Sequence, residues 1–190
     1  MRILCFGDSN TYGYDPRAFS GGRYPAGSRW ADILAQKTGH TVINEGQNGR
    51  EIPRRAGAFS AFESLLTRHA PIDLLLILLG YNDLLQGNGV AAVTDRMEHF
   101  ISHIPLPKER ICLIAPPPMR RGEWVPEEGL PAASVQLAAA YAALADRLGV
   151  SCIHTGDWDI EMAFDGVHFS EAGSKAFGEK LCAALEKAER

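Results

Sequence analysis

Two stretches at opposite ends of the chain carry residue types that together could perform nucleophilic catalysis. Ser9 follows Gly7 and Asp8 directly after an apolar segment, which would place its hydroxyl on a tight turn where a nucleophile is exposed. Asp165 precedes His168 by three residues, so its carboxylate could accept the Nδ1 proton and leave Nε2 free to take the serine proton. Brought together in space, these side chains would form a serine-histidine-aspartate arrangement for acyl transfer.

Acyl transfer also requires hydrogen-bond donors for the oxyanion, and two further segments contain suitable residues. They are residues 44–50, with the sequence NEGQNGR, and residues 80–83, with the sequence GYND. A glycine lets the backbone turn a bare N–H towards a substrate, and an asparagine side chain can donate to a developing negative charge. Both segments are therefore candidates for an oxyanion hole.

Each of these features, taken alone, also has an ordinary structural explanation. Asp8 or Ser9 could cap a helix, Asp165 could make a turn, and Asn and Gly are the commonest turn residues. Asp8 is also too close to Ser9 along the backbone to orient a distant imidazole, so we interpret it as structural.

Histidines and arginines elsewhere give weaker signals. His99 and His103 have the i, i+4 spacing of a metal site, but no H-E-x-x-H pattern is present. An exposed helix face is therefore favoured, and no metal site is predicted. Arg50, Arg54 and Arg55 could meet an acidic substrate, but exposed surface positions are favoured for them as well.

The elements that must position these residues alternate between short apolar strands and periodic helical segments. Strands are predicted over 2–6, 41–44, 73–79, 110–115 and 151–154. Helices are predicted over 28–39, 90–101, 137–148 and 170–185, and in part of 52–69. This alternation is typical of βαβ units, and the third and fourth strands are nearly all apolar. The pattern predicts an α/β fold, a three-layer α/β/α sandwich around a five-stranded parallel sheet.

The candidate residues all follow the ends of predicted strands. Parallel strands end at one edge of their sheet, where α/β proteins bind ligands, and independent structural explanations do not predict this coincidence. Two segments without periodicity, 12–27 and 116–131, are predicted to be long loops, which are often functional. They carry Tyr12, Tyr14 and Trp124, which could line an acyl or aryl pocket or serve only in packing.

The composition is that of an ordinary globular protein. The chain is 46% hydrophobic and 22% charged, and its length of 190 residues predicts a single domain over 1–190. A net charge of -4 gives little support for nucleic-acid binding, and the apolar run 74–79 is too short to span a membrane. We expect no export signal, free thiols at the four cysteines and a cytoplasmic location. A monomer and a homo-oligomer both stay open.

Four blocks of the sequence resemble those of a known family. They are similar, in order, to the blocks of the SGNH hydrolases, also called the GDSL esterase/lipase superfamily: Gly7-Asp8-Ser9-Asn10, Gly49, Gly80-Tyr81-Asn82-Asp83 and Asp165-Gly166-Val167-His168. The resemblance spans 7–168 and implies a flavodoxin-like fold. Residues 2–9, 45–46 and 115–118 are further similar to the arylesterase/acyltransferase branch of that superfamily.

The resemblance implies a role for each matched residue. Ser9 would be the nucleophile, with Asp165 and His168 as its acid and base. The N–H of Ser9, the N–H of Gly49 and the side chain of Asn82 would donate to the oxyanion. The implied activity is hydrolysis of small short-chain acyl or aryl esters through an acyl-enzyme, with acyl transfer as a further activity, and the mechanism requires no cofactor and no metal.

Two departures from the family pattern bear on specificity. Asn10 stands where the GDSL name expects leucine, which affects local packing or pocket shape. Tyr12 and Tyr14 stand where the acyltransferase branch carries tryptophan, so alcohol and acyl preference could differ. A thioesterase, a carbohydrate deacetylase or an acyltransferase would use the same residues. A non-catalytic flavodoxin-like binding module is the alternative from another class, although no phosphate-binding glycine motif is present.

Overall fold

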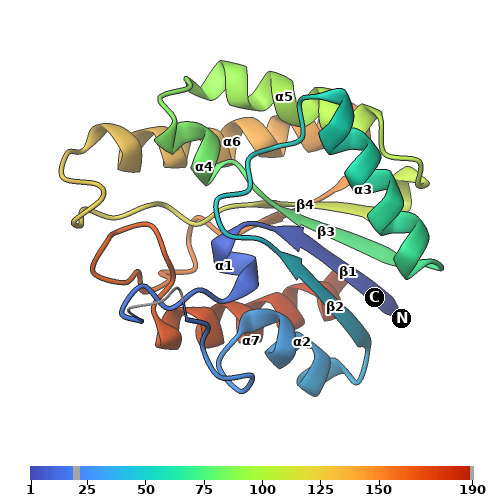
Figure 1. The fold of residues 1–190 in the computed structure, drawn as a ribbon, viewed down its shortest axis with the longest axis horizontal. Helices are drawn as coiled ribbons and strands as arrows, with labels where there is room; N and C mark the ends of the chain where they lie inside the picture. The colour runs from blue at the N-terminus through green and yellow to red at the C-terminus, as the bar shows by residue number, and fades with distance from the viewer. Residues whose placement is uncertain (19–21, 189–190) are drawn as a thin grey trace.

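The computed structural model describes residues 1–18 and 22–188, with a five-stranded sheet at its centre (Figure 1). The strands, in the spatial order β2-β1-β3-β4-β5, are β1 (Arg2–Gly7), β2 (Thr41–Gly46), β3 (Leu74–Leu78), β4 (Ile111–Ala115) and β5 (Ser151–His154). Every neighbouring pair is parallel. The predicted parallel sheet is therefore confirmed.

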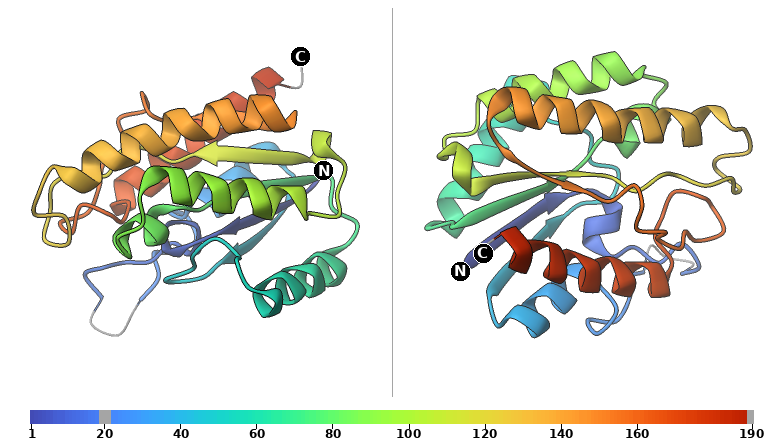
Figure 2. Two further views of the ribbon diagram at one scale, coloured as in Figure 1. Left: turned by 90° about the horizontal axis from the view of Figure 1, so that it is seen from above. Right: turned by 180° about the vertical axis from the view of Figure 1, so that it is seen from behind.

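Helices cover both faces of this sheet (Figures 1 and 2). The longer helices are α2 (Trp30–Thr38), α3 (Ala56–His69), α5 (Val90–Ser102), α6 (Gly129–Leu148) and α7 (Glu171–Ala188). The short elements are α1 (Ser9–Tyr12), α4 (Tyr81–Leu85) and the 3₁₀ turn η1 (Lys108–Arg110). Helices α2 and α7 lie on one face, and α3, α5 and α6 lie on the other (Figure 1). This arrangement confirms the predicted α/β/α sandwich.

The apolar pattern of the central strands explains why both faces are covered. In β3, Leu75 and Ile77 belong to the core beneath α3, α5 and α6, whereas Leu76 and Leu78 belong to the core beneath α2 and α7. Successive residues of a strand point to opposite faces, and all four side chains are buried because helices cover both faces. A strand that is apolar on both faces requires a helical layer on each side.

Some elements differ from the sequence prediction. Helix α6 begins at Gly129, so residues 129–131, predicted as loop, belong to it. Pro131 is tolerated there because the first N–H groups of a helix have no acceptor within the helix. Helix α4 was not predicted, and α1 was anticipated only as a helix that Asp8 or Ser9 could cap, since four or five residues are too few to show a periodic pattern. Residues 19–21 of the predicted loop over 12–27 lie outside the described residues.

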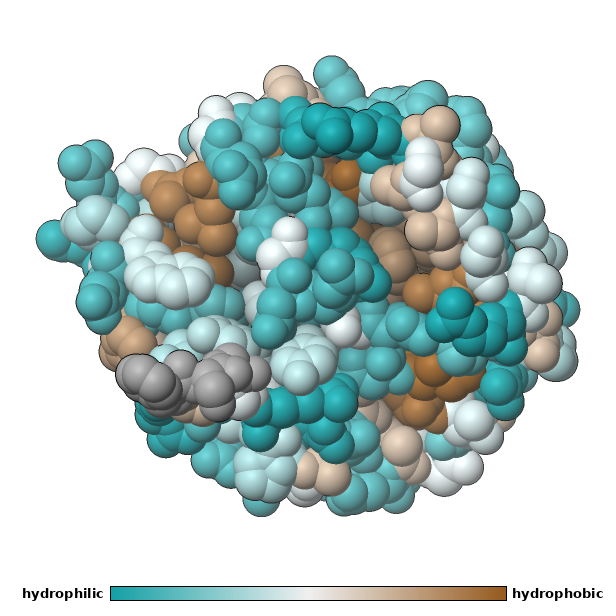
Figure 3. All heavy atoms as spheres, in the orientation of Figure 1, coloured by the Kyte–Doolittle hydropathy of each residue, from teal (hydrophilic) through white to brown (hydrophobic). Residues whose placement is uncertain are grey.

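The carboxyl ends of the strands meet at one edge of the sheet, and α1, α4 and the longer loops gather there (Figure 1). Hydrophilic residues cover most of the face in Figure 3, and apolar residues reach the surface in separate patches. Within the described ranges, no helix is both long and apolar enough to cross a membrane.

Candidate active site

Two hydrogen bonds in series join Ser9, His168 and Asp165. The Oγ atom of Ser9 lies 3.0 Å from Nε2 of His168, and Nδ1 of the same ring lies 2.6 Å from Oδ2 of Asp165. All three residues are buried. With this geometry the imidazole can take the serine proton while the carboxylate holds the opposite ring nitrogen. The structure thus brings Ser9 to a histidine and an aspartate that lie more than 150 residues away in the sequence.

Ser9 occupies the turn between β1 and α1. Asp8 caps this short helix, because its Oδ1 accepts a hydrogen bond of 2.9 Å from the N–H of Asn10. Ser9 is therefore the first helical residue, and the first N–H groups of a helix have no acceptor within it. Its hydroxyl and its N–H both lie at the carboxyl end of β1.

A tight loop holds Asp165 and His168 in position. The Oδ1 atom of Asp165 accepts hydrogen bonds of 2.9 Å from the N–H groups of Val167 and His168, which leaves Oδ2 for the imidazole. Burial alone would raise the pKa of Asp165, but the hydrogen bonds from His168 and Val167 hold it below its usual value. The carboxylate is therefore ionised at neutral pH and fixes the orientation of the ring.

The side chain of Asn10 joins the turn that carries Ser9 to the loop that carries His168. Its Nδ2 donates to the C=O of Val167 at 3.2 Å, and its Oδ1 accepts from the N–H of Phe169 at 2.7 Å. Both partners are chain neighbours of His168. Sequence reasoning missed this role, because a pairing between segments 157 residues apart leaves no local pattern.

Gly49 and Asn82 lie at the ends of the two strands that flank β1. Gly49 has a φ of +72°, a left-handed conformation that glycine adopts without strain. Asn82 lies in α4, after β3, and its Nδ2 donates to the C=O of Arg50 at 3.0 Å. A side-chain amide nitrogen carries two hydrogens, so the second hydrogen of Asn82 can donate to a substrate oxygen.

Asp8 is buried beside the triad without belonging to it. Burial raises the pKa of Asp8 to about 6, against the opposing effects of the hydrogen bond from Asn10 and of positive charge at His168 and Arg50. A carboxyl group in the turn that carries Ser9 therefore changes its charge near pH 6. The interpretation of Asp8 as a purely structural residue did not anticipate this.

Two of the three predicted pocket aromatics contact the imidazole. The ring centroid of His168 lies 4.7 Å from that of Tyr14 and 5.2 Å from that of Trp124. Trp124 is 52% exposed, so much of its indole is free to contact a ligand. The ring of Tyr12 lies instead against Arg23, whose guanidinium carbon is 4.5 Å from the ring centroid.

The loop that carries Trp124 is bonded to the loop that carries the histidine. Three backbone hydrogen bonds of 2.9 to 3.1 Å join them, from Arg120 to Gly166, from Glu123 to Phe164 and from Trp124 to Asp165. Gly122 permits this close approach, since a Cβ atom there would lie 2.4 Å from the backbone of Asp165. The two loops form one connected wall of the site.

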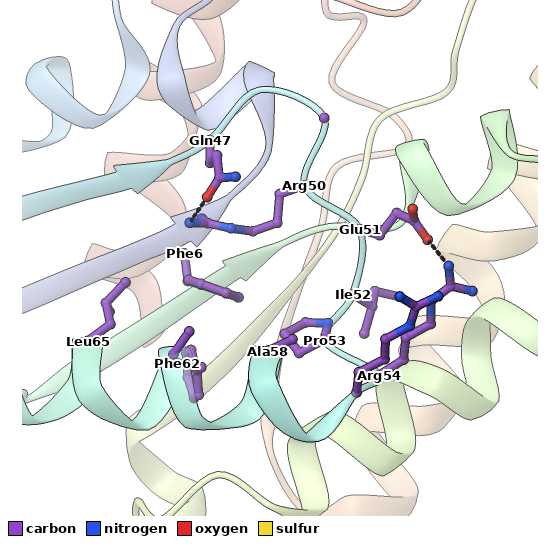
Figure 4. A pocket seen from close by; sticks show the side chains of 13 residues that line it. Phe6, Gln47, Arg50, Glu51, Ile52, Pro53, Arg54, Ala58, Phe62 and Leu65 are labelled. Carbon is purple, nitrogen blue, oxygen red and sulfur yellow. Dashed lines mark hydrogen bonds and ion pairs between the residues drawn. The ribbon is translucent and has the colours of Figure 1, made fainter.

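Arg50 does not occupy the exposed surface position favoured by the sequence. Its side chain is half-buried and folds back beneath the turn, with the guanidinium carbon 4.2 Å from the ring centroid of Phe6 (Figure 4). A cavity of about 540 Å³ adjoins it, between the segment after β2 and helix α3. Arg54 and Arg55, farther along the same segment, are exposed as expected.

Several solved structures share this fold over almost their whole length. The aryl esterase of M. smegmatis superposes on this chain with a TM-score of 0.83 at 27% identity, and the superposition covers 98% of each chain. A carbohydrate acetylesterase family member from Sinorhizobium meliloti gives a TM-score of 0.82 at 27% identity, again over 98% of both chains. A candidate arylesterase from Agrobacterium tumefaciens gives a TM-score of 0.82 at 31% identity, over 98% of this chain and 99% of that one.

Sequence comparison gives a consistent assignment. A search of curated protein sequences finds no match. The model of the GDSL-like lipase/acylhydrolase family, however, matches residues 5–176, which include all the residues of the site described above. The chain therefore belongs to the GDSL-like lipase/acylhydrolase family and is an esterase.

Proposed function

We propose that Ser9, His168 and Asp165 form the catalytic triad of this esterase, which hydrolyses short-chain acyl or aryl esters through an acyl-enzyme. One observation carries the proposal: a continuous hydrogen-bonded path runs from Ser9 Oγ through His168 to the buried, ionised Asp165. Such a path activates a serine hydroxyl without any other group.

The reaction proceeds in two similar halves. His168 Nε2 takes the proton of Ser9 as its oxygen attacks the ester carbonyl, and the resulting imidazolium returns that proton to the departing alkoxide. Water then attacks the acyl-enzyme with His168 as base, and the carboxylic acid leaves as Ser9 recovers its proton. Asp165 stabilises the imidazolium in both halves.

The N–H of Ser9, the N–H of Gly49 and the side chain of Asn82 are the proposed oxyanion donors. Support comes from their placement at the ends of the adjacent strands β1, β2 and β3, around one point of the sheet edge. Donors that are fixed before the reaction stabilise the negative charge that develops in the transition state.

The aromatic contacts of His168 support aryl or short acyl groups as substrates. Tyr14 and Trp124 both lie against the imidazole, and about half of Trp124 is exposed, so a leaving group at Ser9 would meet an aromatic surface. The similarity to the M. smegmatis aryl esterase supports the same preference. An alcohol bound there in place of water would accept the acyl group, which is the chemistry of acyl transfer.

Removal of acetyl groups from carbohydrates is a second candidate function. It is favoured by the similarity to the carbohydrate acetylesterase family member of S. meliloti and by the exposed indole of Trp124, since aromatic rings also bind the apolar faces of sugars. The two functions are distinguished by comparing kcat/KM for phenyl acetate and for acetylated monosaccharides with the same enzyme preparation.

Labelling with a fluorophosphonate tests the proposed nucleophile directly. We expect a single adduct, located on Ser9 by mass spectrometry, and loss of both labelling and hydrolysis in Ser9→Ala. Asp8→Asn, in the adjacent position, is the matched control and should still be labelled. An adduct on any residue other than Ser9 would refute the assignment.

We also infer a reducing compartment such as the cytoplasm. The four cysteines are free, and burial raises the pKa of Cys112 to about 12, so its thiol stays protonated and unreactive. Detection of the native protein in the cytoplasmic fraction, with four titratable thiols after denaturation, would support this location.

A further inference from the structure

The side chain of Arg50 binds two backbone carbonyls and the side chain of Gln47, and Figure 4 shows the bond to Gln47. Its Nη1 donates to the C=O of Gly7 at 2.7 Å and also to the C=O of Glu45, and its Nη2 donates to Oε1 of Gln47 at 3.1 Å. Gly7 ends β1, Glu45 lies near the end of β2, and Gln47 begins the turn that contains Gly49. The guanidinium therefore ties the nucleophile strand, its neighbour and this turn together.

The backbone of Arg50 also holds Asn82, whose side chain is another of the proposed oxyanion donors. The C=O of Arg50 accepts the hydrogen bond from Asn82 Nδ2 at 3.0 Å. Arg50 also follows Gly49 directly in the chain. A displacement of Arg50 would therefore move the N–H of Gly49 and release the side chain of Asn82 at the same time.

The surroundings of this guanidinium do not favour a role in stability alone. Its hydrogen bonds reach uncharged oxygens, and burial lowers the pKa of Arg50 despite the opposing charges of Glu45 and Asp8. Partly desolvating a cation without a hydrogen-bonded carboxylate costs stability. Arg54, by contrast, makes an ordinary ion pair of 3.1 Å with Glu51.

We propose that Arg50 is a positioning residue of the oxyanion hole, which fixes the N–H of Gly49 and the amide of Asn82 relative to Ser9. This inference rests on the proposed function, because it takes Gly49 and Asn82 as oxyanion donors. Arg50 touches none of the reacting atoms in this scheme. It acts by holding the donors in place before the charge develops.

Substitutions at position 50 test the proposal through kcat. Arg50→Ala should lower kcat for p-nitrophenyl acetate about 10- to 100-fold while KM changes less than about threefold, because misplaced donors weaken the transition state selectively. Arg50→Lys should recover only part of this loss, since an ammonium group lacks the fork geometry that reaches all three acceptors. Arg54→Ala, on the same segment, is the matched control and should keep the wild-type kcat.

Chemical rescue separates positioning from a general structural defect. The cavity of about 540 Å³ beside Arg50 gives a free guanidinium ion access to the space vacated in Arg50→Ala. Guanidinium chloride at concentrations far below those that unfold proteins should restore part of the kcat of Arg50→Ala. It should restore none in Arg50→Met, whose side chain fills the space, and none in Asn82→Ala.

A double-mutant cycle then tests whether Arg50 acts through Asn82. The variant with both Arg50→Ala and Asn82→Ala should lose less activity than the product of the single losses. A wild-type kcat in Arg50→Ala, or single losses that simply multiply, would overturn the inference. If Arg50→Ala does not fold, Arg50→Lys takes its place in the cycle. Failure of the proposed function itself is distinguishable, because the wild-type enzyme would then form no fluorophosphonate adduct on Ser9.

Discussion

Asp165 binds His168 twice: Oδ2 lies 2.6 Å from the ring Nδ1, while Oδ1 accepts the backbone N–H of the same residue. The carboxylate therefore fixes both the position of the histidine and the nitrogen that carries its proton. Loss of either function would leave the serine without a correctly oriented base.

Asp165→Asn should separate these two functions. The asparagine Oδ1 can still accept the backbone N–H groups, but its amide nitrogen donates towards Nδ1 and favours the wrong tautomer of the ring. We expect kcat to fall about 10⁴-fold with little change in fold, as replacing the acid of a triad by its amide does elsewhere. Steady-state kinetics and circular dichroism measure the two effects. A kcat within tenfold of the wild type would contradict the assignment.

Asn10→Ala should lower activity more than its effect on stability explains. It removes the two buried hydrogen bonds to the neighbours of His168, which costs about 1–3 kcal/mol of folding free energy. The loosened loop should also reduce kcat at least about tenfold, because small displacements of a catalytic base are costly. Thr155→Val, which removes a buried hydrogen bond to Ala115 away from the triad, is the control and should lose stability only. Denaturant unfolding and kinetics on both variants provide the comparison, and equal activity losses would show that Asn10 has no special role.

Asp8→Asn should change how stability depends on pH. The pKa of Asp8 is raised to about 6 in the folded protein, so the folded state holds this proton more tightly than the unfolded chain does. The wild type therefore loses up to about 3 kcal/mol of stability through this group as the pH rises towards about 6. Above that pH the contribution of Asp8 changes no further. The variant lacks this penalty, so its stability relative to the wild type should increase over the same pH range. Urea unfolding at a series of pH values checks this, and a constant difference between the two proteins would disprove the shift.

Gly122→Ala should disturb the site from outside the triad. Its Cβ would lie 2.4 Å from the backbone of Asp165, so the two joined loops must separate, at a cost of about 1–3 kcal/mol and a clear loss of kcat. Gly129→Ala is the matched control, because no atom lies near the added methyl and alanine favours the helix. Thermal unfolding of the two variants gives the test, and equal melting temperatures would argue against a tight contact at position 122.

Trp124→Ala should weaken aryl substrates selectively. An aromatic contact contributes about 0.5–1.5 kcal/mol, so KM for phenyl acetate should rise about two- to tenfold, with a smaller change for ethyl acetate. Phe164→Ala is the control. Phe164 is similarly exposed, at 54%, and its part in the joined loops is a backbone hydrogen bond, from the N–H of Glu123 to its C=O, which the substitution keeps. Similar effects of both variants on both substrates would remove Trp124 from the binding site.

Much of the fold follows from the sequence because parallel strands that are apolar on both faces have few other arrangements. The ends of β3 and β4 were predicted to within one residue of those observed. β2 extends through Glu45 and Gly46, beyond its predicted end, since these residues have low strand propensity but pair with Phe6 and Gly7 of β1. Here tertiary pairing decides the boundary, not local preference.

The same reasoning predicted only some of the residues that form and position the site. Ser9, Asp165 and His168 have side chains that can catalyse acyl transfer, and their shared position after the ends of predicted strands indicated that they would meet. The residue types and positions of Asn10 and Arg50 did not indicate their contacts. Their roles depend on bonds to backbone atoms of distant segments, and one sequence without its coordinates contains no trace of those partners.

The three backbone hydrogen bonds between the Trp124 loop and the histidine loop have a practical consequence for altering this enzyme. They involve no side-chain atoms, so the identity of residue 124 can change without removing any backbone hydrogen bond that positions the loop of His168. If Trp124 binds the leaving group as proposed, a library of substitutions at this single codon should vary which esters are accepted while the hydrogen bonds among Ser9, His168 and Asp165 stay in place. We therefore expect substrate range to change while the hydrogen bonds of the proposed triad are kept, at the cost of the ring contact between Trp124 and His168.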